Sequence, residues 1–150
     1  MAHGVLAIAS GGGHWVQLRR MREAFDGLDV AFASVYPDYA DDVAPHRFYS
    51  FPDVSRFSKH KLPWLMLRIM TILLKERPHT VVTTGSFPGL VTLALAKTLF
   101  RSRTIWIDSI ANCERLSTSG QRARQFADIY LTQWPHLARD GGPQHWGAVL

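Results

Sequence analysis

Short apolar runs alternate with segments of helical periodicity along this chain, and this alternation constrains its fold more than any other feature. Strands are predicted over residues 5–9, 30–35, 81–84, 104–107 and 129–132. Helices are predicted over 14–25, 62–75, 88–99 and 119–126. Strands that alternate with helices are the signature of a parallel sheet wrapped by helices. We therefore predict an α/β, Rossmann-like fold in a single domain over residues 1–150, with 36–60 as a long irregular segment that is functional or mobile.

Composition narrows the possible partners and the compartment. The 17 lysines and arginines against 12 acidic residues give a formal charge of +5, which suits an anionic partner such as a phosphate, nucleic acid or acidic lipid but also an ordinary basic protein. The single cysteine, Cys113, allows no internal disulfide and favours a reducing compartment. The first apolar run is too short to span a membrane and lacks the basic start of a signal peptide. We therefore expect a cytoplasmic protein.

A glycine-rich turn lies between the first predicted strand and the first predicted helix. Its residues are Ser10, Gly11, Gly12, Gly13 and His14. Free N–H groups at a helix start suit a phosphate or diphosphate, and open α/β folds bind ligands at this edge of the sheet. The pattern is neither the dinucleotide fingerprint nor a Walker loop. A purely structural tight turn remains the alternative to a binding loop.

Two further strand ends carry polar residues. Thr84, Gly85 and Ser86 lead from a strand into a helix, either as a second wall of the same cleft or as an ordinary turn capped by serine. Asp108 follows the next strand, as a general base, a ligand of a sugar hydroxyl, or a cap of the following turn. Four candidate binding residues come directly after it: Ser109, Asn112, Glu114 and Ser119.

The segment 62–74 is apolar at nearly every position, yet basic residues flank and interrupt it. It is too short and too interrupted to span a bilayer. One interpretation is an interfacial helix in a membrane surface, with Trp64, Leu67, Arg68 and Met70 facing the lipid. The alternatives are a helix buried on two sides and a contact patch for another subunit.

Short motifs in a fixed order resemble the Alg14 family and its bacterial exopolysaccharide relatives of the PssD type, over nearly the whole chain. They are Ser10-Gly11-Gly12-Gly13-His14-x-x-Gln17-Leu18, Thr84-Gly85-Ser86-x-Pro88-Gly89, Ile107-Asp108-Ser109-Ile110-Ala111, Ser117-x-Ser119-Gly120, Ala127-Asp128 and Gln133-Trp134-Pro135.

The resemblance implies the N-terminal, acceptor-side half of a split GT-B glycosyltransferase. An Alg13- or PssE-like subunit would bind the nucleotide sugar, which agrees with a chain that is short for a whole enzyme. The implied reaction moves glucuronic acid or an N-acetylhexosamine from a UDP-sugar to a lipid-diphosphate-linked glycan in exopolysaccharide or capsule biosynthesis. It implies no cofactor and no metal. The membrane helix of eukaryotic members is missing, so the resemblance implies peripheral attachment at the cytoplasmic face of the inner or plasma membrane.

The expected mechanism is direct displacement with inversion at the anomeric carbon. The amides of Gly12 and Gly13 would hold the acceptor diphosphate or face the donor, and His14 or Asp108 would take the acceptor proton. The main alternative is a non-catalytic subunit that anchors and activates a catalytic partner. A nucleotide-binding Rossmann protein lacks its fingerprint here, and no nucleic-acid motif appears, so no nucleic-acid partner is expected.

Overall fold

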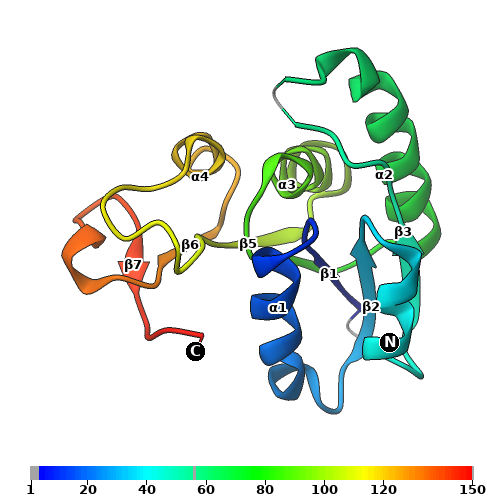
Figure 1. Cartoon of the computed structure of the whole chain (residues 1–150), viewed down its shortest axis with the longest axis horizontal. Coiled ribbons are helices and arrows are strands. Elements are labelled where there is room, and N and C mark those ends of the chain that lie inside the picture. Colours follow the sequence, from blue (N-terminus) through cyan, green and yellow to red (C-terminus); the bar gives the residue numbers. More distant parts are fainter. Residues whose placement is uncertain (1–3, 56, 150) are drawn as a thin grey trace.

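A computed structural model describes residues 4–55 and 57–149, and its centre is one parallel sheet of seven strands. The strands are β1 (Gly4–Ile8), β2 (Asp29–Ser34), β3 (Arg47–Ser50), β4 (Thr80–Thr83), β5 (Arg103–Ile107), β6 (Ile129–Thr132) and β7 (Gln144–His145). Their order across the sheet is β3-β2-β1-β4-β5-β6-β7 (Figure 1). Every neighbouring pair is parallel, which confirms the predicted α/β, Rossmann-like class.

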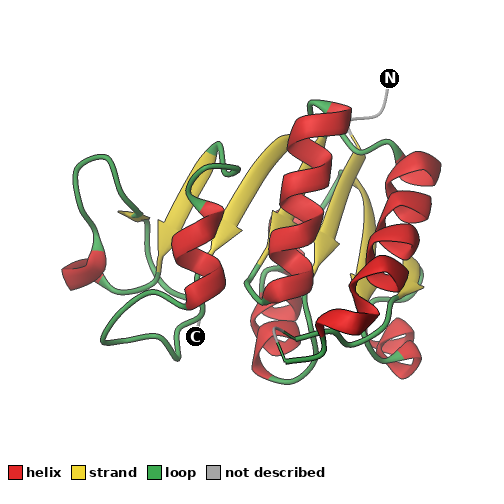
Figure 2. Ribbon diagram, turned by 90° about the horizontal axis from the view of Figure 1, so that it is seen from above, coloured by secondary structure: helices red, strands yellow, loops and turns green. Residues whose placement is uncertain are grey.

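Helices cover both faces of the sheet. The α-helices are α1 (Gly13–Arg20), α2 (Leu62–Glu76), α3 (Phe87–Phe100) and α4 (Thr118–Ala123). Short 3-10 helices are η1 (Arg22–Phe25), η2 (Pro37–Asp42), η3 (Lys59–Lys61) and η4 (Pro135–Leu137). Figure 2 shows α2, α3 and α4 side by side across one face, with α1 behind the sheet. This three-layer arrangement buries the strands on both faces, which accounts for their apolar sequences.

Alternate residues of β1 feed two separate cores. Leu6 and Ile8 pack with residues of α2 and α3, including Ile69 and Leu93. Val5 and Ala7 face the opposite layer, whose largest side chain is Trp15 of α1. The pleat of a strand sends successive side chains to opposite faces, so one apolar run serves both cores.

The strand order reverses between β1 and β4. From β1 the chain builds outward to β2 and β3, and it then crosses back through α2 to place β4 on the other side of β1. The turns that follow β1 and β4 therefore open next to each other at the carboxyl edge. Ligands of open α/β folds bind at such a switch point.

Local structure differs from the predictions at three places. The predicted helix over 14–25 ends at Arg20 and continues as the 3-10 helix η1, because Met21 takes a conformation outside the helical region. The segment 36–60, predicted as irregular, contains strand β3 and two short helices. Strands β3 and β7 were not predicted. They form the two edges of the sheet, contain only four and two residues, and have partly exposed side chains, so neither has a continuous apolar run in the sequence.

Candidate functional site

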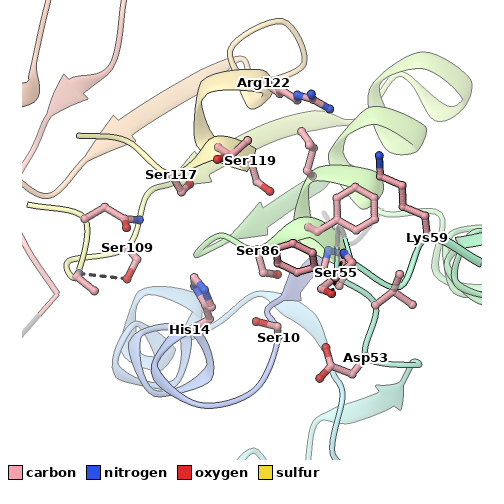
Figure 3. Close-up of a pocket in the computed structure, with 18 residues that line it drawn as sticks. Ser10, His14, Asp53, Ser55, Lys59, Ser86, Ser109, Ser117, Ser119 and Arg122 are labelled. Carbon is pink, nitrogen blue, oxygen red and sulfur yellow. Dashed lines mark hydrogen bonds between the residues drawn. The ribbon is translucent and has the colours of Figure 1, made fainter. Parts of the chain in front are cut away.

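A cleft of about 560 Å³ opens at the switch point, between the turns that follow β1, β4 and β5 (Figure 3). Of the predicted site residues it brings together Ser10, His14, Ser86, Ser109, Asn112 and Ser119. The other residues that line it are Asp53, Val54, Ser55, Phe57, Lys59, Phe87, Pro88, Leu90, Ala111, Ser117, Thr118 and Arg122. The prediction that the turns after β1 and β4 share one cleft is therefore confirmed.

His14 lines this cleft, and a hydrogen bond to a backbone carbonyl defines the tautomer of its ring. Its Nδ1 lies 3.1 Å from the carbonyl oxygen of Thr84, and the Thr84 hydroxyl donates to the His14 carbonyl at 2.7 Å. A carbonyl only accepts, so Nδ1 carries the proton and Nε2 of the neutral ring keeps its lone pair. No residue that the structure describes hydrogen-bonds Nε2. A half-buried histidine held in this way has the form that a general base requires.

Gly85 makes room for that imidazole and explains why a glycine follows Thr84. A Cβ at Gly85 would lie 3.0 Å from Cε1 and 3.1 Å from Nδ1 of His14. The backbone of Gly85 also has φ +121°, which side chains rarely adopt. Thr84 and Gly85 therefore support His14 from behind and do not line the cleft themselves.

The N-terminus of α3 borders the cleft, which Ser86, Phe87, Pro88 and Leu90 line. Its N-cap residue Ser86 has φ 84° and ψ 164°, a region almost confined to glycine. The Ser86 hydroxyl oxygen is buried, and no described group hydrogen-bonds it. Strained backbone and an unpartnered polar atom at the start of a fourteen-residue helix favour an anionic ligand there.

Two basic side chains, neither of them predicted as a site residue, add positive charge to the cleft. Lys59 comes from the segment before α2 and Arg122 from α4, and Figure 3 shows them above the same hollow as His14. Among the described residues that line the cleft, Asp53 is the one acidic side chain. Segment 53–59 has no sequence period, so only its basic composition before an apolar helix hinted at a role. The cleft can accept a diphosphate against two cations and the start of α3.

Part of the glycine-rich turn, at Gly11 and Gly12, has a structural role. The backbone of Gly11 passes so close to Tyr36 that a Cβ would lie 2.6 Å from its ring. The amide of Gly12 donates to the hydroxyl of Tyr39 at 3.2 Å. Gly12 and Gly13 are exposed, and neither they nor Gly11 line the cleft. The structural alternative therefore fits Gly11 and Gly12, and Ser10 is the residue of this turn that reaches the cleft.

Asp108 lies beneath the cleft and is only 1% exposed. Its carboxylate accepts hydrogen bonds from Trp106 Nε1 at 3.1 Å, Asn112 Nδ2 at 3.2 Å, and the Ser117 hydroxyl and amide at 2.8 and 3.2 Å. The backbone of Gly120 packs directly against it. These contacts occupy the carboxylate inside the protein and fit the capping alternative, in which Asp108 holds the loop that carries Asn112 and Ser117.

A buried pair of glutamines ties α1 to this loop. Gln17 Oε1 accepts from Gln133 Nε2 at 2.6 Å and from the Ile110 amide at 3.2 Å, and Gln17 Nε2 donates to Ser109 Oγ at 3.0 Å. Gln133 also donates to the Asp108 carbonyl at 3.0 Å and accepts from the Val149 amide at 2.7 Å. Gln17 follows His14 on the same helix, so this network fixes His14 relative to the loop of Ser109 and Asn112.

Glu114 does not belong to the cleft. It lines a second hollow on the other side of the loop and α4. The chain bends at Glu114 and Arg115, after Asn112, and these neighbours in sequence line different hollows. The prediction that Glu114 joins Asn112 in one site is therefore corrected.

Helix α2 exposes large apolar side chains beside the cleft. Trp64 and Leu67 are each 69% exposed, and Phe57, at the rim of the cleft, is 83% exposed. Met70 is half-buried, and Arg68 turns back to donate to the Ser50 carbonyl at 2.8 Å. The opposite side of α2 packs in the core, so the prediction of a helix buried on two sides is wrong.

Within residues 4–55 and 57–149, no helix has the length and apolar character needed to cross a bilayer. In the same residues, no three histidine, cysteine, aspartate or glutamate side chains come together as a candidate metal site.

Comparison with known sequences matches residues 54–150 to a family described as "Oligosaccharide biosynthesis protein Alg14 like". The UDP-N-acetylglucosamine transferase subunit ALG14 of Eremothecium gossypii is 36% identical over 78 residues, which are 49% of this chain and 35% of that protein. The protein of the same description from Yarrowia lipolytica is 39% identical over 70 residues, 43% of this chain and 32% of that protein. The matched parts thus span about a third of these curated relatives.

Comparison with solved structures shows the fold. MurG of Acinetobacter baumannii superposes on 93% of this chain with a TM-score of 0.76 at 12% identity, and the match covers 44% of MurG. The UDP-N-acetylglucosamine 2-epimerase of Rickettsia bellii covers 91% of this chain with a TM-score of 0.66 at 14% identity, over 40% of its own length. The chain has the fold of less than half of each of these larger proteins.

Proposed function

The chain belongs to the family of Alg14-like oligosaccharide biosynthesis proteins, and on this premise we propose that it is the acceptor-binding subunit of a two-subunit, UDP-sugar-dependent glycosyltransferase. The observation that carries the proposal is the cleft, in which a histidine with an available Nε2 faces the N-terminus of α3 and two basic side chains. The acceptor we propose is a lipid-diphosphate-linked glycan of the kind used in exopolysaccharide or capsule biosynthesis. N-acetylglucosamine is the first sugar to test, because both curated relatives are named for its transfer.

The proposed reaction divides between two subunits. An Alg13- or PssE-like partner would present the UDP-sugar over the carboxyl edge of the sheet. The diphosphate of the acceptor would lie between the α3 amides, Lys59 and Arg122, where helix dipole and cations favour negative charge.

His14 is the proposed general base. Nε2 would take the proton of the acceptor hydroxyl while its oxygen attacks the anomeric carbon, the bond from that carbon to the UDP oxygen breaks, and UDP leaves with the electron pair. The anomeric configuration inverts because attack and departure are on opposite faces. Nδ1 stays bonded to the Thr84 carbonyl, which fixes the ring during the transfer. The buried Asp108 would act by holding the loop of Asn112 and Ser117.

The lipid part of the acceptor would leave the cleft past Phe57 toward the exposed face of α2. Phe57 lines the cleft, and η3 joins its segment directly to α2. Trp64 and Leu67 extend the apolar surface, and Lys59 and Lys61 flank it with positive charge. We propose peripheral attachment at the cytoplasmic face, the reducing side that a single cysteine favours.

The decisive experiment measures transfer from UDP-N-acetylglucosamine and UDP-glucuronic acid to a short-chain lipid-diphosphate acceptor. The chain is assayed alone, with a candidate partner, and with that partner plus His14→Asn. Asparagine can still donate to Thr84 but supplies no base, so we expect kcat to fall about 100- to 10,000-fold. The control Glu23→Gln changes an exposed side chain of η1 that lines neither this cleft nor the second hollow, and it should leave transfer unchanged.

The second candidate function is a non-catalytic subunit that anchors and activates its partner, favoured by the exposed apolar face of α2. Transfer that survives His14→Asn but still requires this chain would identify the anchor and refute the catalytic role. Transfer by the partner alone would refute both functions.

A further inference from the structure

Figure 1 shows α4, β6 and β7 together at one end of the sheet. A second hollow, of about 390 Å³, is lined by residues of α4, β6 and the loops around them. Three arginines line it, each from a different segment: Arg115 from the loop after β5, Arg124 from the end of α4 and Arg139 from the loop before β7. We propose that this hollow is a binding site for a phosphate-bearing ligand, separate from the cleft of His14.

The three arginines have no partner within the described chain. None of their guanidinium groups hydrogen-bonds or forms an ion pair with residues 4–55 or 57–149. Arg47 shows the contrast, because it bonds both Asp29 and Glu76. Like charges around one hollow repel each other, and the fold gains no internal contact in return. All three arginines are exposed, so their charges are available to an external anion.

The remaining lining groups leave the hollow positive. Glu114 is its one carboxylate and forms no ion pair with the arginines. Tyr130 contributes no charge near neutral pH, because burial raises the pKa of its phenol to about 12. Its hydroxyl donates to the Gly120 carbonyl at 2.5 Å. Three positive charges therefore face a single negative one.

Arginine chemistry favours phosphate among possible anions. A guanidinium is always charged and presents a planar fork of donors that fits two oxygens of a phosphate at once. Several such forks around one hollow suit a group with many oxygens, and its volume lies within the usual range for small-molecule sites. Either a nucleotide diphosphate or the head group of an anionic phospholipid offers this chemistry.

The hollow is distinct from the proposed acceptor cleft. Helix α4 separates them: Arg122 lines the cleft, whereas Gln121 and Arg124 line the hollow. The two sites share no lining residue. This inference therefore stands independently of the proposed glycosyl transfer, and variants can address each site alone.

The test titrates pyrophosphate into the full chain while the side-chain Nε–Hε signals of the arginines are followed by NMR. We expect saturable shifts at Arg115, Arg124 and Arg139, and the same shifts in Lys59→Gln/Arg122→Gln, where the cleft is weakened. Replacing one charged hydrogen-bond donor weakens binding about tenfold or more, so Arg124→Gln/Arg139→Gln should lose binding at the hollow. Signals that do not saturate, or that saturate equally in this double variant, would overturn the proposal.

Two further arms identify the source of the phosphate. UDP is titrated in the same way, and sedimentation measures binding to vesicles of phosphatidylcholine with and without phosphatidylglycerol. A nucleotide ligand predicts UDP binding that Arg124→Gln/Arg139→Gln abolishes; a lipid ligand predicts the same loss for the anionic vesicles. Arg20→Gln/Arg101→Gln, which changes two exposed residues at the ends of α1 and α3, removes the same charge and should affect neither. If the control variant lost as much binding, the binding would depend on total charge and not on this hollow, and the proposal would be overturned.

Discussion

The glutamine pair beneath the cleft offers the sharpest test of how this fold is held together. Replacing Gln17 by leucine keeps the volume of the side chain but removes three hydrogen bonds, to Ser109, Ile110 and Gln133. Gln17 is only 5% exposed, so water cannot easily replace them. Ser109 and Gln133 keep other partners, whereas the Ile110 amide loses its acceptor.

The expected cost follows from these contacts. Each hydrogen bond contributes about 1 kcal/mol net, and leaving a buried amide without an acceptor adds about 1 kcal/mol or more, with leucine packing as a partial offset. We expect Gln17→Leu to lower the free energy of unfolding by about 2–4 kcal/mol, a large share of the usual 5–15 kcal/mol of a domain.

Urea unfolding followed by tryptophan fluorescence measures this difference as a shift of the midpoint at constant slope. The matched control is Gln121→Leu, which removes one exposed bond to the Leu116 carbonyl and should change stability by less than about 0.5 kcal/mol. If Gln17→Leu proved no more destabilising than this control, the network would not fix α1 to the loop of Ser109, and our reasoning on the position of His14 would fail.

Three further predictions concern packing, the membrane and pH. Gly120→Ala should destabilise by more than about 1 kcal/mol, because its Cβ would overlap a buried carboxylate oxygen, whereas Gly13→Ala, with open space around it, should be neutral in the same thermal melts. Trp64→Gln should weaken sedimentation with vesicles more than Leu99→Gln, an equally exposed apolar position on α3; equal effects would contradict a membrane role for α2. Burial raises the pKa of the Asp128 carboxyl, but its ion pair and hydrogen bonds lower it below 3.8 overall, so the stability it contributes is present at neutral pH and lost as pH falls through its folded pKa. The cost of Asp128→Asn in urea should therefore be larger at pH 7 than at pH 3.

Much of the architecture could be predicted from local sequence. The predicted strand over 129–132 matches β6 from end to end, and the other four predicted strands agree within one residue. Continuous apolar runs suffice because a parallel sheet covered on both faces buries every residue of its central strands. Strand β3 has the half-exposed sequence Arg47–Ser50, so it carries no such run.

The candidate site could be predicted only where it follows strand ends. His14 and Ser86 come directly after β1 and β4, and the rule that ligands bind at the carboxyl edge brought them to one cleft. Lys59 lines the same cleft but comes from a segment without periodicity, so no sequence pattern predicted it as a site residue. Glu114 shows the opposite failure, because the loop bends at Glu114 and Arg115 and Glu114 lines the second hollow instead of the cleft.

The sequence by itself determined which segments become strands and helices and where glycines permit sharp turns. The tertiary structure decided which polar groups meet. Gln17 and Gln133 are separated by 116 positions and still share a hydrogen bond of 2.6 Å. Local conformation is set by neighbours along the chain, whereas such a contact depends on the order and register of all the strands between them. For the same reason, only the assembled fold shows that Asp108 is buried and that three arginines surround one hollow.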